Sequence, residues 1–202
     1  MLVRSLNIED KLLSLKTSSF LSAPEDDRRR LGEELSASIA AGQFDKVLEI
    51  VDSCLPKDDV GEAIAEGERS DVVHDLLAHL AEEMIRMNRE KQEEIRGFLA
   101  WLEDFTGAGV DDLSNKTKVQ AYYEIEFPEL LAVLKKKKRK LACDPSRRAF
   151  GEDLRREYSA TVEKLAPLIA RIGTVDRLID AIVYRLYGLT AEEVAIVEGS
   201  LS

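Results

Sequence analysis

The residues of this sequence with the clearest capacity for chemistry are basic, and six of them are consecutive. The ten that we identify as candidate nucleic-acid-binding residues are Lys116, Lys118, Lys135, Lys136, Lys137, Lys138, Arg139, Lys140, Arg147 and Arg148. Phosphate is the natural partner of such a cluster, because Lys and Arg neutralise the charge of a nucleic-acid backbone. The alternative is a solvated helix end, whose positive charge suits the negative end of the helix dipole. No base-reading motif is visible, so any contact would be electrostatic positioning.

The charge of the chain is distributed unevenly around this cluster. Residues 132–156 contain ten Lys or Arg against three acids, for a formal charge of +7. The whole chain carries −10, so the remainder carries −17. Phosphates would be repelled over most of such an acidic surface, and DNA contact is therefore expected only within the basic window.

A search for catalytic or metal-binding arrangements is negative. His74 and His79 are five residues apart, which places them on different sides of a helix, unlike an i, i+4 metal pair. Cys54 and Cys143 are isolated and are typical of reduced thiols in a cytosolic protein. No G-x-G-x-x-G, P-loop or G-x-S-x-G motif occurs. The sequence therefore predicts a chain that is not an enzyme and that holds no metal and no cofactor.

Composition indicates an all-α protein. The 202 residues include 45% hydrophobic and 34% charged residues, with few aromatics and no convincing alternation typical of a strand. No run of about 18 apolar residues is present, and the amino terminus lacks the apolar centre of a signal peptide. We therefore expect no membrane contact and a cytoplasmic location.

Two long apolar patterns define the predicted architecture. Apolar residues at three- and four-residue spacing predict one helix from about Asp71 to Phe105, with Ser70 as its N-cap. A second pattern runs from Leu154 to Leu186 and is expected to be kinked or divided by Pro167 and Gly173. Together they predict an antiparallel helical hairpin over residues 69–202, with a basic helical insert at about 107–148.

Shorter segments flank the predicted hairpin. Residues 1–68 are expected to form a helical lead-in, with a short or poorly ordered helix within 1–20, helices at about 24–41 and 44–55, and one helical turn at about 60–65. Beyond the hairpin, Gly188 is expected to end one helix. Thr190 and Glu193 should form a capping box for the next, reinforced by a staple between Leu189 and Val194.

The middle of the first long helix differs from its ends. Residues 88–94 contain no apolar side chain through two turns. This stretch is either a solvated charged face or a surface for a partner.

Several segments resemble a known protein family. Residues 90–103, 112–118 and 129–136 resemble the carboxyl-terminal helical region of bacterial and archaeal type II restriction–modification DNA adenine methyltransferases. Residues 178–190 and 196–199 resemble the close of those chains, and the end signature reads VYRLYGLTAEE at residues 183–193 and IVEG at residues 196–199. The resemblance covers roughly residues 69–200.

The resemblance implies a context without an activity. The methylase motif N-P-P-[YFW], a glycine-rich cofactor loop and a nuclease core are all missing, so no catalytic residue can be transferred. The chain is then either a fragment of a larger polypeptide or a separate subunit. The expected function is a non-catalytic accessory domain that contacts the DNA backbone or braces a target-recognition region. The alternative is a protein-interaction or oligomerisation module, whose partners would be neighbouring methyltransferase or nuclease domains or a second copy of the chain.

Overall fold

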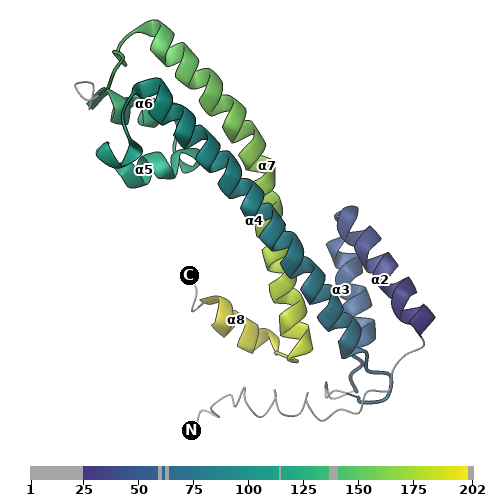
Figure 1. The fold of residues 1–202 in the computed structure, drawn as a ribbon. Helices are drawn as coiled ribbons and strands as arrows, with labels where there is room; N and C mark the ends of the chain where they lie inside the picture. The colour runs from purple at the N-terminus through teal and green to yellow at the C-terminus, as the bar shows by residue number, and fades with distance from the viewer. Residues whose placement is uncertain (1–24, 59–60, 62–63, 114, 137–140, 200–202) are drawn as a thin grey trace, which may run out of the picture. The chain divides into compact units, whose positions relative to one another are not determined.

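The computed structural model describes residues 25–58, 61, 64–113, 115–136 and 141–199, and its regular elements are helical (Figure 1). No strand occurs in this described part, so the all-α prediction is confirmed. The elements in chain order, with η marking 3-10 helices, are α2 (Glu25–Ala40), α3 (Phe44–Cys54), α4 (Ser70–Thr106), η1 (Val110–Asp112), α5 (Lys116–Gln120), η2 (Tyr122–Glu124), α6 (Phe127–Lys136), α7 (Arg148–Leu186) and α8 (Ala191–Gly199).

The helices α4 and α7 pack together as the predicted hairpin, and the insert connects them. α4 is 37 residues long and begins one residue earlier and ends one residue later than predicted. α7 continues through Pro167 for 39 residues, so the expected division does not occur. Proline removes one backbone donor from a helix, and burial of Leu165 and Val175 on either side opposes a break.

The chain forms two compact units, and each is described here by itself. The first, the terminal unit, contains residues 1–82 and 175–202. Its buried apolar residues include Val47, Val51, Leu80, Leu178 and Ile182. At its surface, Arg185 Nε donates to Asp52 Oδ1 at 2.9 Å, which links α7 to α3. This unit therefore joins the lead-in helices to the two ends of the hairpin helices through an apolar core.

The glycine that ends α7 and the capping box that begins α8 have the predicted geometry. Gly188 adopts φ 62°, and its N–H donates to Arg185 O at 3.0 Å while Leu189 N–H donates to Tyr184 O at 2.9 Å. These are the two bonds of a Schellman motif, which satisfies the last carbonyls of α7. Thr190 N–H then donates to Glu193 Oε2 at 2.9 Å, and Glu193 N–H donates to Thr190 Oγ1 at 3.3 Å. The capping box is confirmed.

The two lead-in helices predicted at about 24–41 and 44–55 are present as α2 and α3. α2 ends before Gly42, which adopts φ 70°, and α3 ends within one residue of its predicted end. Gly61, Ile64 and Ala65 are not helical, so this part of the predicted turn is wrong. Ile64 N–H instead donates to Pro56 O at 2.9 Å, a bond that closes a loop. The predicted helix within 1–20 lies outside the described residues.

The second unit, the insert unit, contains residues 83–174. Its core combines α4 and α7 with every element of the insert, and its fully buried members include Leu102, Tyr122, Leu130, Leu134, Leu154 and Leu165. The rings of Phe98 and Tyr122 stack with centroids 3.9 Å apart. Aromatic pairs of this kind add stability beyond their buried area. The insert is therefore packed onto the hairpin as part of one core.

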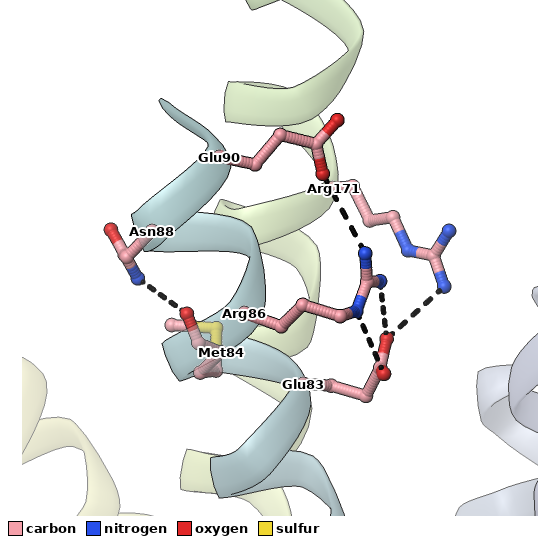
Figure 2. A network of polar contacts seen from close by, with 6 residues as sticks. All are labelled: Glu83, Met84, Arg86, Asn88, Glu90 and Arg171. Atoms are coloured by element: carbon pink, nitrogen blue, oxygen red, sulfur yellow. Dashed lines mark hydrogen bonds and ion pairs between the residues drawn. The ribbon is translucent and has the colours of Figure 1, made fainter. Parts of the chain in front are cut away.

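Two ion pairs bridge the polar middle of α4 and the facing part of α7, and we call residues 83–94 and 164–174 the ionic waist. Figure 2 shows Glu83 between two cations, with Arg86 Nη2 at 2.8 Å and Arg171 Nη2 at 3.8 Å. Lys164 Nζ lies 3.2 Å from Glu94 Oε2. Most residues of 88–94 are exposed, as both a solvated face and a surface for a partner require.

No helix in the described ranges has both the length and the apolar character needed to cross a bilayer.

Candidate nucleic-acid interface

The segment that follows the basic run is fixed to the carboxyl end of α4. Ala142 N–H donates to Thr106 O at 2.7 Å, and the Cys143 thiol donates to Phe105 O at 3.1 Å. These bonds satisfy carbonyls that a helix end leaves without an intrahelical partner. Gly107 allows the close approach, because a Cβ at this position would lie 2.6 Å from the Cβ of Ala142. The segment between the basic run and α7 is thus held to the end of α4.

The opposite side of the run is anchored by α6. Phe127, Leu130, Val133 and Leu134 are buried on one face of this helix. Tyr158 Oη of α7 donates to Ile125 O at 2.6 Å just before α6 begins. The guanidinium of Arg155 lies 4.1 Å from the centre of the Phe127 ring, within the range of a cation–π interaction. These contacts fix α6 on α7 and place Lys135 and Lys136 in its last turn.

The candidate cations fall into two sets, four outside the described residues and six within them. Lys137, Lys138, Arg139 and Lys140 lie outside the described residues. The six that the structure describes are all exposed, and they are Lys116 and Lys118 in α5, Lys135 and Lys136 in α6, and Arg147 and Arg148 at the start of α7. They come from three elements of one packed unit, as the predicted insert requires.

Three of the six described cations are already paired with carboxylates. Lys118 Nζ contacts Glu129 Oε1 and links α5 to α6. The other two pairs are Lys116 Nζ with Asp111 Oδ1 at 3.5 Å and Arg148 Nε with Glu152 Oε1 at 2.6 Å. We call Lys116, Lys118 and Arg148 the paired cations. Their carboxylates weaken the positive potential that the sequence alone suggested.

The other three described cations have no such partner. Within the described ranges, no carboxylate lies at ion-pair distance from Lys135, Lys136 or Arg147. We call these three residues the open cations. Two of them end α6, where positive charge also favours the helix dipole, so part of their role is structural. Their exposed ammonium and guanidinium groups can still donate hydrogen bonds to an oxyanion.

The acidic partners were missed by the sequence prediction, although one had a local signal. Glu152 follows Arg148 by four residues, a spacing at which side chains on a helix meet. Glu129 is eleven residues from Lys118, and only the packing of α5 against α6 brings the two together. The contact between Lys118 and Glu129 therefore depends on the tertiary structure.

Two cysteines, two histidines and one buried tyrosine are further candidate residues. Cys54 is buried, and burial raises the pKa of its thiol above the ordinary value. Cys143 is half-buried, and its thiol donates to a backbone carbonyl. His74 and His79 are exposed on α4. Tyr122 is fully buried, its hydroxyl has no hydrogen-bond partner among the described residues, and burial raises its pKa.

Comparison with known proteins gives one match. No curated protein and no solved structure matches the chain significantly. Residues 70–183 match a protein family described as "Domain of unknown function (DUF8810)". The matched region begins with the first residue of α4 and extends into the last turn of α7, so it contains nearly all of the hairpin and the whole insert. Because it covers more than half of the 202 residues, this chain belongs to the DUF8810 family.

Proposed function

We propose that this chain is a non-catalytic helical domain of a restriction–modification methyltransferase system, and that its insert contacts the DNA backbone. The observation that carries the proposal is the set of open cations on either side of the run Lys137–Lys140. Both flanks of that run are fixed to α4 or α7 by hydrogen bonds or core packing. A rigid basic surface binds phosphate with less loss of conformational entropy than a free tail does.

The distribution of charge between the two units supports the same location for DNA contact. The insert unit contains eighteen Lys or Arg and sixteen Asp or Glu, for a formal charge of +2. The terminal unit carries the remaining −12. A phosphate backbone would therefore be repelled by the terminal unit and attracted only locally by the insert.

The role within the system follows from the resemblance of residues 69–200 to the carboxyl-terminal region of the methyltransferases. The hairpin would brace the target-recognition region, and the insert would position the DNA without reading its sequence. Catalysis would belong to a separate methyltransferase domain. The proposed site of action is the cytoplasm, where the chromosomal DNA of a prokaryote is located.

Fluorescence anisotropy with a labelled duplex tests this proposal. The K135Q/K136Q variant should weaken binding and lower the slope of log K against log salt by about 1.8, because each lost phosphate contact removes about 0.9. The matched control is R89Q/R96Q, which removes two exposed cations from α4 outside the insert. Equal losses in the two variants, or no duplex binding by the wild type at low salt, would contradict the proposal.

A second candidate function is a protein-interaction module, and α8 is the feature that favours it. α8 has no buried side chain, and Ile196 is 69% exposed. Exposed apolar side chains on a helix mark contact surfaces when they form a patch. Light scattering and a pull-down with the neighbouring methyltransferase would test this function. Loss of the complex in I196E, with duplex binding retained, would favour protein interaction over DNA contact.

A further inference from the structure

We infer that Glu129 and Glu152 restrain the proposed DNA contact, because they hold Lys118 and Arg148 in intramolecular ion pairs. The inference rests on the proposed function and adds regulation of the same site. It divides the candidate cations into those that contact phosphate without competition in the wild type and those for which a carboxylate of the same chain competes with phosphate. The expected ligand of both classes is a backbone phosphate of duplex DNA.

The contact between Lys118 and Glu129 connects two short elements of the insert. Lys118 lies in the last turn of α5, and Glu129 lies in the first turn of α6. Both side chains are about half exposed, so the pair is accessible to an approaching phosphate. Solvent-exposed pairs of this kind are weak, and a strong oxyanion can therefore compete for the lysine.

The contact between Arg148 and Glu152 lies on one exposed face of α7. The atoms Arg148 Nε and Glu152 Oε1 are 2.6 Å apart, and the Arg148 side chain is 92% exposed. Only the Nε donor is engaged in this contact, while a guanidinium has five N–H donors. Removal of Glu152 would free the positive charge without disturbing a buried contact.

Both carboxylates oppose phosphate binding in two ways. Each cancels the charge of the cation that it contacts, and each also repels phosphate through its own charge. Only the first effect depends on the paired cation. A double-mutant cycle separates the two effects, because the coupling between two substitutions measures their direct interaction.

The experiment measures duplex affinity by anisotropy over a range of salt for wild type, E129Q, K118Q and E129Q/K118Q. E129Q should increase the salt slope by about 0.9, so that roughly threefold to fourfold more affinity is lost when salt is raised fourfold. In the K118Q background, E129Q should change the slope much less, because only the direct repulsion between Glu129 and phosphate is then removed. The control D104N neutralises an exposed acid at the end of α4 and should leave the slope unchanged.

A second cycle with R148Q and E152Q covers the case in which E129Q loosens α5. Circular dichroism and thermal unfolding of each variant establish that the fold is retained. If E129Q and E152Q change the slope equally with and without their partner cations, the inference is wrong although DNA binding stands. If wild type binds no duplex, or if K135Q/K136Q is indistinguishable from R89Q/R96Q, the proposed function is wrong and this inference with it.

Discussion

The insert unit contains two regions in which the same pair of helices is held together differently. At the tip of the hairpin, α4 and α7 contribute to a buried apolar core that includes Phe98, Leu102, Phe150 and Leu154. At the ionic waist, the α4 residues 83–94 bury only one side chain among those described, that of Met87. There Lys164 and Glu94, and Arg171 and Glu83, bridge the helices. The tip should therefore dominate stability, since exposed ion pairs contribute far less than buried apolar side chains.

The largest expected effect is on the tip core. Leu154→Ala removes a side chain with no exposed surface and should lower the free energy of unfolding by about 2–5 kcal/mol. Ile85→Ala truncates a side chain at the waist that is 66% exposed, and it should change stability by less than about 0.5 kcal/mol. Urea unfolding followed by circular dichroism measures both. Similar losses in the two variants would remove the proposed difference between tip and waist.

A smaller effect is expected at the glycine that ends α4. Gly107→Ala would force a side chain into a position with φ 67° and place its Cβ against Ala142, which should cost about 1–3 kcal/mol. The control Gly97→Ala lies within α4 with no atom near its Cβ position. It should raise stability by about 0.5–1 kcal/mol through helix propensity. Thermal unfolding measures both changes in stability, which should have opposite signs. Destabilisation of both variants would contradict the prediction.

Tyr122 should make the tip sensitive to alkaline pH. Burial raises the pKa of Tyr122 above its ordinary value, so the folded state retains a proton that the unfolded state loses above about pH 10. Stability is therefore unaffected by this group at lower pH and falls above pH 10, by up to about 1.4 kcal/mol per pH unit. Tyr122→Phe should remove this dependence.

The same substitution tests whether the Tyr122 hydroxyl stabilises the fold. Because the hydroxyl has no hydrogen-bond partner, Tyr122→Phe should alter stability at pH 7 by no more than about 1 kcal/mol, in the stabilising direction. Denaturant titrations at neutral and alkaline pH measure both effects. An unchanged alkaline dependence in the variant would show that other tyrosines or lysines cause it.

The smallest expected effect belongs to the ionic waist. Glu94→Gln removes the contact with Lys164 and should lower stability by less than about 1 kcal/mol. The loss should diminish at high salt, because mobile ions screen an exposed pair. The matched control is Glu93→Gln, an exposed neighbour on the same helix. A loss above 2 kcal/mol that persists in high salt would show that the waist depends on this pair more than its exposure suggests.

The helices themselves were predictable because their signals are local. Apolar periodicity defined α4 to within one residue at each end, and Gly188 with the capping box of Thr190 and Glu193 defined the corner before α8. Such signals involve residues that are at most a few positions apart. The turn expected at 60–65 is wrong at Gly61 and Ile64, where Gly61 N–H donates to Asp58 O and Ile64 N–H donates to Pro56 O in a loop.

The sequence by itself determined the all-α class, the long helical patterns and the exposed basic character of the insert. Only the tertiary structure decided which cations are open and which are paired. Lys118 meets Glu129 across eleven residues, Cys143 meets Phe105 across 38, and Lys164 meets Glu94 across 70. Contacts at such separations depend on how helices pack, and packing is set by the joint shape of many side chains in one core.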